Sequence, residues 1–353
     1  MTDDSAETVH VDAPRHASVE LSDPGRLIAV IPHLIGFQPT DALVLIALHH
    51  GDIVVTAWYD LSDASTSARG LADEVAATTR HLHDAVFVAC IVGDDPDQAN
   101  TQGRRLLHKQ LVTTFATQNR DIHVYGVRDV SAGARWFDYS LPDHRHGTLP
   151  DPDISPAATA AAHDTVVHPS YEALAATLEP DNTDDVTRRS NLIDSILTNT
   201  ANTSAGDKGE TRRLLALVRK HIEQAAHRVD PLTDREVAEL AIALSNLEVR
   251  DLALAFALGE HAAHAEQLWT ELTRKAPAPE RAEPAALLAM FAYLRGNVTL
   301  ARLALRQAET AHPTHRLATL TRIAITVGMS PVRFRRVAEF AEERATLLGE
   351  DRL

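Results

Sequence analysis

The chain is very poor in cysteine. Its 353 residues include one, Cys90, which stands inside the apolar run AVFVACIV. A single cysteine forms no intramolecular disulfide, so the sequence predicts a protein of a reducing compartment, the cytoplasm, with Cys90 as a small buried hydrophobic residue. The chain also has no CxxC pair, no HExxH, no GxSxG and no P-loop. These absences disfavour several common enzyme classes.

Positive charge is scarce as well. Lysine and arginine total 34 against 49 aspartate and glutamate, which gives a formal net charge of −15. Such a charge repels phosphate backbones and anionic lipid, so neither nucleic acid nor a membrane is expected as a partner. Hydrophobic residues at 44% and charged residues at 24% are ordinary for a soluble globular protein. At roughly 100–200 residues per domain, the length allows two domains.

The chain contains no long unbroken apolar run. Its most apolar stretch, Leu27 to Leu61, is interrupted at Pro32 and His33 and again by GFQPTD at 36–41. A spanning helix needs about 20 predominantly apolar residues, so this stretch predicts buried elements of a soluble fold. We expect a helix capped by Ser22, and then a β-hairpin in which HHGD joins DALVLIAL to IVVTAWYDL. The acidic segment 1–17 lacks the pattern of a signal peptide and is predicted to be a disordered tail.

The front half alternates between strand and helix patterns. After the hairpin come a helical stretch at 66–84, the strand-like AVFVACIVG, a helical stretch at 96–119 and the strand-like DIHVYGVRDV. We therefore predict a three-layer α/β domain over 18–182, whose mixed sheet has a β-hairpin followed by βαβ units, with parallel strands in its later part. The Pro/Asp-rich stretch 140–170 predicts an irregular excursion, after which short helices pack back on the sheet.

The back half, 183–353, has helical patterns throughout. LTDREVAELAIAL opens with a capping box formed by Thr233 and Glu236. Two segments, AEQLWTELTRKAP and ARLALRQAETAHP, match position for position and begin 36 residues apart, at Ala265 and Ala301. Small residues at helix contacts and a closing proline are typical of tetratricopeptide-like hairpins, with Gly296 and Asn297 in the turn of the second unit. This pattern predicts an all-α domain that binds a protein or peptide partner.

Several motifs in this order resemble one family. In the front half they are SDPGRLIAVIPHLIGFQPTDALVLIAL, VTAWYDL, GARWFDYS and PSYEAL; in the back half they are VRDLAL, LWTELTRKAP, LLAMFAYLRGN and ARLALRQA. Together they are similar to the domain of unknown function DUF4192, found chiefly in actinobacteria, over nearly the whole chain. The resemblance implies a cytoplasmic protein and carries no established catalytic residues. The chain departs from the family in having YSLPDHRHG where many members carry clustered cysteines, and Trp58 where many carry arginine.

Acidic residues follow the predicted strands of the front half. They are Asp60 after VTAWY, Asp94 and Asp95 after VACIVG, and Asp129 after VYGVR. In open α/β sheets, ligands bind outside the carboxyl ends of strands, and convergent carboxylates suit Mg²⁺ or another hard cation. The alternative is that these residues only form turns and helix caps, which aspartate also favours.

Two further clusters are candidate sites. Arg135, Trp136 and Tyr139 in GARWFDYS form an aromatic and cationic group suited to an interface or a planar ligand; the alternative is that the aromatic residues close the core. The loop sequence DHRHG offers three weak candidate metal ligands, which are otherwise solvated loop residues. They are Asp143, His144 and His146.

The sequence supports more than one class of function. A non-catalytic binding or scaffolding protein follows from the helical half, and a small-molecule sensor would add a ligand at the sheet edge. The alternative is an enzyme, a metal-assisted hydrolase or nucleotide-handling protein that uses the acidic strand ends. No cofactor and no oligomeric state is predicted.

Overall fold

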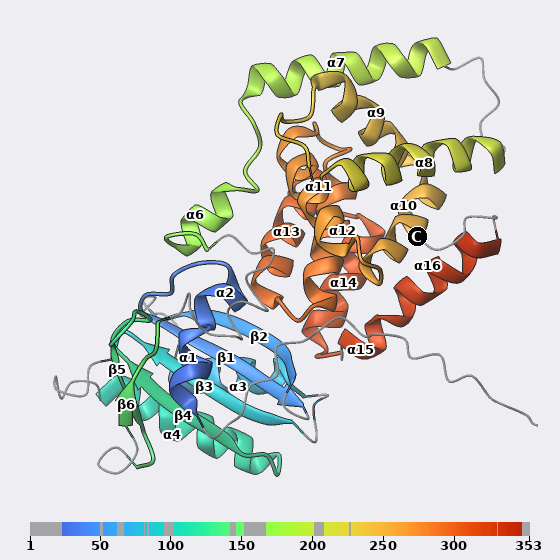
Figure 1. The fold of residues 1–353 in the computed structure, drawn as a ribbon. Helices are drawn as coiled ribbons and strands as arrows, with labels where there is room; N and C mark the ends of the chain where they lie inside the picture. The colour runs from blue at the N-terminus through green and yellow to red at the C-terminus, as the bar shows by residue number, and fades with distance from the viewer. Residues whose placement is uncertain are drawn as a thin grey trace, which may run out of the picture.

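The structure of the chain is a computed structural model, shown in Figure 1. An α/β half occupies the first part of the chain and a helical half the second. The residues that the structure describes are 23–49, 52–61, 67–80, 82, 85–94, 102–141, 146–151, 167–200, 208–225, 227–329 and 331–347. The predicted tail at 1–17 lies outside them.

The α/β half is built on one mixed sheet of six strands in the order β2-β1-β3-β4-β5-β6. The strands are β1 (Ala42–His49), β2 (Asp52–Asp60), β3 (Val86–Val92), β4 (Ile122–Val127), β5 (Arg135–Asp138) and β6 (His146–Thr148). Only β3 and β4 are parallel neighbours; the other adjacent pairs are antiparallel. It follows that β2, β3 and β4 point the same way, so their carboxyl ends lie at one edge.

The hairpin and the first strands follow the sequence pattern closely. The β1 side chains from Ala42 to Leu48 are buried, because helices cover both faces of the sheet. The predicted first helix is divided into α1 (Pro24–Ala29) and α2 (Ile31–Ile35), and Asp23 caps α1 by accepting from the Arg26 backbone N–H at 3.2 Å. The division occurs just before Pro32, which has no N–H to continue the α1 ladder.

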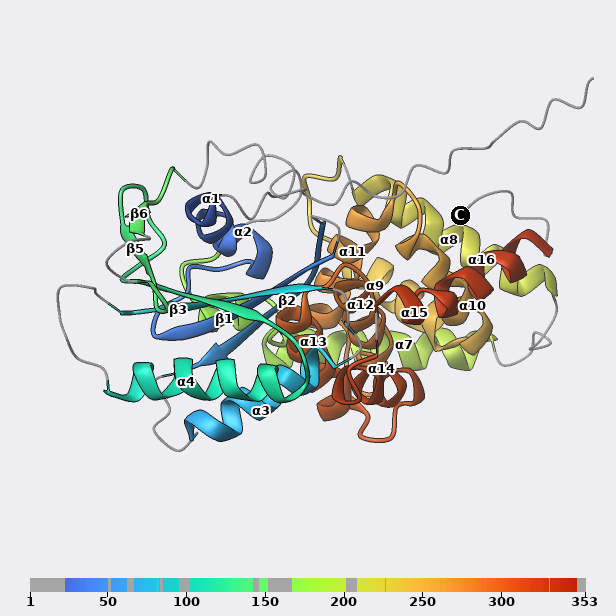
Figure 2. The same cartoon turned by 90° about the horizontal axis from the view of Figure 1, so that it is seen from below.

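The sheet is the middle of three layers (Figure 2). The helices α3 (Ala68–Thr78) and α4 (Gln102–Thr117) cover one face, and α1 and α2 lie on the other. The helix α6 (Tyr171–Ala176) forms within the predicted PSYEALAATLEP segment, capped by Ser170. The first predicted short helix, at 158–168, lies almost wholly outside the described residues.

The expected parallel strands are present, since β2, β3 and β4 run in the same direction and β3 pairs with β4 in parallel. The sheet continues beyond them in the antiparallel strands β5 and β6, which were not predicted. The prediction that the stretch 140–170 is irregular was wrong in part, since His146–Thr148 forms the edge strand β6. The segments RWFD and HGT are too short to show an alternation of apolar and polar positions, so no strand is predicted from their sequence.

The helical half begins at α7. Its elements are α7 (Thr183–Thr200), α8 (Lys208–Ala225), α9 (Asp234–Ser245), α10 (Leu247–Ala253), the 3₁₀ helix η2 (Leu254–Ala257), α11 (Ala262–Lys275), α12 (Ala282–Leu294), α13 (Val298–Ala311), α14 (Arg316–Thr326), α15 (Pro331–Phe334) and α16 (Arg336–Leu347). The capping box of Thr233 and Glu236 is present at α9.

The repeated segments form α11 and α13, and their bulky positions are equivalent in burial. Trp269 and Leu305, at the bulky position of each segment, are both buried, at 0% and 4% exposed. The preceding helices differ, because α12 is continuous whereas the first unit has α10 followed by η2. The tetratricopeptide-like character of these helices stays a prediction.

A tight turn of the helical half joins it to the sheet. Gly296, at φ +84°, lies between α12 and α13, and its carbonyl accepts from the Thr56 backbone N–H of β2 at 2.9 Å. A Cβ on Gly296 would stand 2.7 Å from the Val54 carbonyl oxygen, so only glycine fits. Asn297 caps α13 and also donates from Nδ2 to the Leu34 carbonyl at 3.2 Å.

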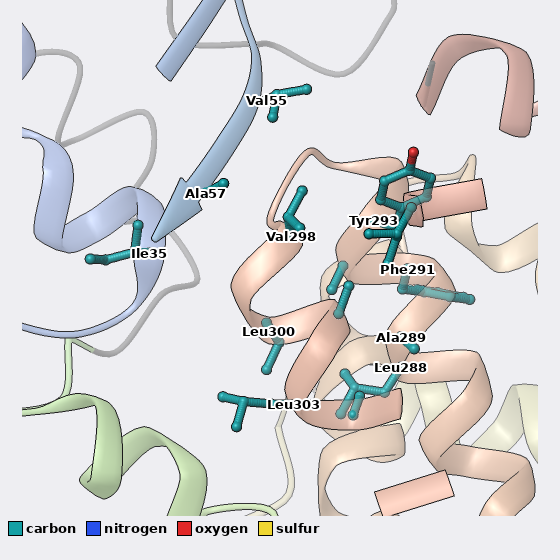
Figure 3. Close-up of a cluster of buried hydrophobic side chains, with 14 of the residues drawn as sticks. Ile35, Val55, Ala57, Leu288, Ala289, Phe291, Tyr293, Val298, Leu300 and Leu303 are labelled. Atoms are coloured by element: carbon teal, nitrogen blue, oxygen red, sulfur yellow. The ribbon is translucent and has the colours of Figure 1, made fainter. Parts of the chain in front are cut away.

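Apolar side chains complete the junction of the two halves (Figure 3). Val298 of α13 faces Val55 and Ala57 of β2, and all three are buried. The edge strand β2 is thereby covered, which removes an edge that would otherwise pair with other chains. The sheet and the helices share one continuous hydrophobic core.

Candidate functional site

The candidate site lies at the carboxyl end of β3. Gly93, at φ +90°, follows the strand, and its N–H donates to the Val127 carbonyl of β4 at 2.9 Å. A Cβ at Gly93 would stand 2.7 Å from Oδ1 of Asp41, the residue before β1. The turn therefore requires glycine for its backbone conformation and for space. It places Asp94 at the strand end, where its side chain is only 6% exposed.

The buried carboxylate of Asp94 accepts a hydrogen bond from the Tyr139 hydroxyl. Tyr139 follows β5, and the His108 ring of α4 stacks on it with ring centroids 5.2 Å apart and planes at 25°. Burial raises the pKa of the Tyr139 hydroxyl, and the hydrogen bond to Asp94 raises it further. Tyr139 therefore stays a protonated donor at physiological pH. We call Asp94, Tyr139 and His108 the strand-end triad.

His108 has the chemistry of a neutral base in this triad. Burial lowers its pKa, against a weaker raising effect from the charge of Asp138. Its Nε2 atom is buried and has no hydrogen-bond partner among the described residues. An uncharged imidazole of this kind can accept a hydrogen bond or a proton from a bound molecule.

An ion pair stands beside the triad. Arg104, one turn before His108 on α4, donates from Nη2 to Oδ1 of Asp41 at 2.7 Å. The Arg104 side chain is mostly buried, whereas that of Asp41 is more than half exposed. The Arg104 charge is close enough to Tyr139 to lower the pKa of its hydroxyl in part. The pair thus connects the buried triad to the surface through Asp41.

Phe137 and Gly126 fix the position of Tyr139. The Phe137 ring is 5.0 Å from that of Tyr139 and lies across Gly126 of β4, where a Cβ would come within 2.3 Å of it. Both rings are therefore on the face covered by α4. The close packing predicts that any side chain at Gly126 would displace the two rings.

Trp136 lies on the opposite face of the sheet. Its indole nitrogen would be 2.9 Å from a Cβ placed on Gly25 of α1, and its ring meets Tyr125 edge to face at 5.6 Å. Trp136 is 7% exposed, as a residue that closes the core would be. The cluster of Arg135, Trp136 and Tyr139 therefore does not form one surface, because neighbouring strand residues point to opposite faces.

The acidic strand ends share an edge, but their side chains are engaged differently. Asp129 accepts from Nε of Arg128 at 2.7 Å and from the Ser131 hydroxyl; these two hydrogen bonds lower the pKa of its carboxyl. The charge of Asp60 acts on Glu172 of α6, so Asp60 lies in a different part of the structure from the triad. The structure thus brings Asp94 together with Tyr139 and leaves Asp60, Asp129 and the exposed Arg135 outside the triad.

The metal-site hypotheses fall partly outside the described residues. Asp95, Asp143 and His144 are not among them, and His146 is exposed on β6 opposite Phe137. Among the residues that the structure describes, no group of three or more His, Cys, Asp or Glu side chains is arranged to hold a metal ion. Cys90 is fully buried, and burial raises the pKa of its thiol, in agreement with the expected hydrophobic role.

Sequence reasoning missed His108, Arg104 and Asp41. Arg104 and His108 are four residues apart on a predicted helix, so they share a face, and this spacing was the available signal. The direction of that face depends on Leu107, Leu111 and Phe115, which bury α4 against the sheet. The sequence does not indicate Asp41 as a site residue, because its side chain approaches Gly93 only through the backbone conformation at Asp41, with φ +41°.

The comparisons with known proteins give a family. Neither the curated proteins nor the solved structures include a match to this chain. In the described part of the chain, no helix combines the length and the apolar character that crossing a membrane requires. The family model for DUF4192, a domain of unknown function, matches residues 24–332. That range covers most of the chain, and the chain therefore belongs to the DUF4192 family.

Proposed function

We propose that the chain is a non-catalytic binding protein that senses a small, amine-bearing ligand at the strand-end triad. The observation that carries the proposal is the buried hydrogen bond of Tyr139 to Asp94 beneath His108. The site lies at the carboxyl end of β3 beside its parallel neighbour β4, where α/β sheets bind ligands. The helical half, fixed to the same sheet, would respond to occupancy.

The charges of the site favour a cation. Asp94 and Asp41 contribute two carboxylates against the single guanidinium of Arg104, and burial keeps His108 neutral. A protonated amine can donate hydrogen bonds to a carboxylate and to the lone pair of the neutral His108 ring. A phosphate or carboxylate ligand would instead meet net negative charge.

The test is thermal unfolding of the full chain with a panel of small amines, among them putrescine, agmatine and glucosamine. Size-matched carboxylates and Mg²⁺ serve as comparison ligands. A ligand that binds the folded state at about 100 times its Kd stabilises it by about 2.7 kcal/mol, which shifts the midpoint measurably. We expect an amine to raise the midpoint for the wild type and not for Asp94→Asn.

Asp129→Asn is the matched control, because Asp129 is an acid of the same sheet edge that is bonded within its own turn. It should keep the amine response in full. If no amine shifts the midpoint, or if both variants lose the response equally, the proposed site is wrong.

A second candidate is a hydrolytic enzyme that uses the acids at the strand ends. His108 favours it, since a neutral imidazole beside a tyrosine hydroxyl can act as a general base. Hydrolysis of p-nitrophenyl acetate and p-nitrophenyl phosphate would be compared between wild type and His108→Gln. A hydrolysis rate that decreases as the pH is lowered, and that is lost in His108→Gln, would favour the enzyme. Equal background rates of hydrolysis in both proteins would favour binding alone.

A further inference from the structure

The outer side of α14 carries a stripe of exposed apolar residues. Leu320 is 43% exposed and Ile323 50% exposed, and Val327, the C-cap residue, is 52% exposed. Their spacing of three and then four residues places them on one face of the helix. Exposed apolar residues scattered singly are ordinary, whereas three aligned on one face indicate a contact surface. We call these residues the α14 stripe.

The stripe is open because the chain leaves α14 uncovered. After α12, the turn at Gly296 returns the chain as α13, which packs along α12. After α14 there is a similar left-handed turn at Gly328, φ +63°, but the helix that follows does not return along α14. Instead α16 packs against α10 and η2. In Figure 2, α14 lies at the lower margin of the helical half.

Specific contacts direct the chain away from α14. The Phe334 ring of α15 packs edge to face on Tyr293 of α12, with centroids 5.5 Å apart. The Tyr293 hydroxyl also donates to the Met329 carbonyl, just beyond the turn. These contacts fix α15 against α12, so the side of α14 on which a second hairpin helix would pack remains open.

The helix α14 itself carries positive charge. The sequence of α14, RLATLTRIAIT, contains two arginines and no acidic residue, in a chain whose net charge is −15. Arg316 is exposed one turn before Leu320, whereas Arg322, next to Ile323, already pairs with Glu309 of α13 at 2.6 Å. A second copy of α14 laid on the stripe would offer no acidic residue to Arg316, whereas an acidic helix would.

We infer that the α14 stripe binds an amphipathic helix of an acidic partner protein. Its apolar residues, spaced at three and four, would cover Leu320, Ile323 and Val327, and a flanking glutamate or aspartate would pair with Arg316. The partner helix would take the place that the second helix of a hairpin takes in the α12–α13 pair. This surface is separate from the strand-end triad, and the inference does not rest on the ligand proposed there.

The test uses fluorescence anisotropy with the full chain and two labelled, designed peptides. Each has about 18 residues with leucines on one helical face, and the flanking positions are glutamate in one peptide and lysine in the other. We expect saturable binding of the glutamate peptide that weakens with added salt, and at least about tenfold weaker binding of the lysine peptide.

Variants assign the binding to the stripe. Ile323→Asp should abolish binding of the glutamate peptide, and Arg316→Glu should invert the preference toward the lysine peptide. Phe340→Asp is the matched control, because Phe340 is an apolar residue of α16 that is 68% exposed and lies off the stripe. Asp94→Asn should also bind the peptide normally. Circular dichroism would verify that each variant is folded.

Three results would overturn the inference. One is equal binding of the two peptides, or no saturable binding of either. Another is unchanged binding by Ile323→Asp. The third is a wild-type dimer by light scattering that Ile323→Asp converts to a monomer, since a second copy would then be the occupant of the stripe.

Discussion

Two buried arginines, one in each half of the molecule, are held in different ways. In the helical half, the guanidinium of Arg189, 5% exposed, donates to Asp181 at 2.8 Å and to Asp234 at 2.7 Å. In the α/β half, Arg120, 7% exposed, donates to the carbonyls of Thr79 and Ala76 and lies over two phenyl rings. One cation is neutralised by acids and the other is held by neutral groups.

The pKa shifts of the two arginines run in opposite directions. Burial works against the charge of Arg189, but its hydrogen bonds to Asp234 and Asp181 outweigh it and raise the pKa. Burial lowers the pKa of Arg120, and the charge of Arg80 adds to the effect. Arg189 therefore holds helices together through matched charges, whereas Arg120 is buried with neutral partners. Arg281 of the helical half is of the second kind, since it donates to the Ala276 carbonyl and burial lowers its pKa.

Removal of each buried cation should give the largest contrast between the two arginines. Arg189→Met removes one of the two cations that each acid has, since Asp181 keeps Arg274 and Asp234 keeps Arg188. We therefore expect a loss of about 2–3 kcal/mol in unfolding free energy, below the full figure for breaking a wholly buried pair. Arg120→Met leaves only carbonyl acceptors unpaired and keeps an apolar contact with the rings, so about 1–2 kcal/mol should be lost. Urea unfolding measures both.

The dependence on salt separates the two causes. Asp181 and Asp234 are only partly buried, so the loss of unfolding free energy in Arg189→Met should become smaller as salt is added. The loss in Arg120→Met should not change with salt, because its partners are neutral. Equal losses with the same salt dependence would show that the two arginines are held alike, and the contrast would fail.

Much of the architecture is evident from the sequence, because the elements concerned are long and regular. The β1 and β3 segments are almost wholly apolar. Strands β3 and β4 pair in parallel, as strands separated by a helix in a sheet covered on both faces are expected to do. Strands β5 and β6 were missed since they have four and three residues, and their pairing depends on β4 already being in place. Short strands are specified by tertiary contacts more than by local sequence.

The junction at Gly296 is the second test of how the halves depend on each other. Gly296→Ala adds a Cβ at 2.7 Å from the Val54 carbonyl, and its positive φ also strains any side chain. Gly133 has a similar φ of +78°, but nothing lies within 4 Å of the added Cβ. We expect Gly133→Ala to cost about 1 kcal/mol from the backbone alone and Gly296→Ala about 2–3 kcal/mol.

The difference between these two glycine variants measures the contact of the halves. Urea unfolding of both proteins would give it directly, and the same measurement would show whether the halves unfold in one transition. Equal losses would mean that the turn can move off β2 without cost, and that the halves are joined by the apolar contacts alone.

The site was less predictable than the fold. Asp94 and Tyr139 were found from strand-end and motif arguments, but their contact joins residues 45 positions apart and requires Tyr139 to face α4. Which face a residue takes depends on the register of β5, and a shift of one residue would exchange Tyr139 for Asp138. The sequence pattern of four residues does not fix that register.

The smallest expected effect is on the pH dependence of stability, where each half contributes one histidine. Burial lowers the pKa of His108 in the α/β half and, against the charge of Glu236, that of His221 in the helical half. The unfolded chain takes up these protons near pH 6.5, before the folded chain does. Between the folded and unfolded pKa values the unfolded state holds more protons, so the free energy of unfolding decreases as the pH falls below about 6.5.

The slope should be at most about 1.4 kcal/mol per pH unit for each histidine, and it should vanish above about pH 7.5. Carboxyl groups with lowered pKa, such as Asp129, lose their contribution only near pH 4 and below, so unfolding measured from about pH 5 to 7.5 isolates the histidines. His108→Gln and His221→Gln should each remove part of the slope, and their sum should account for most of it. If His108→Gln leaves the slope unchanged, His108 is protonated as easily in the folded chain as in the unfolded one, and the neutral imidazole on which the strand-end triad depends is wrong.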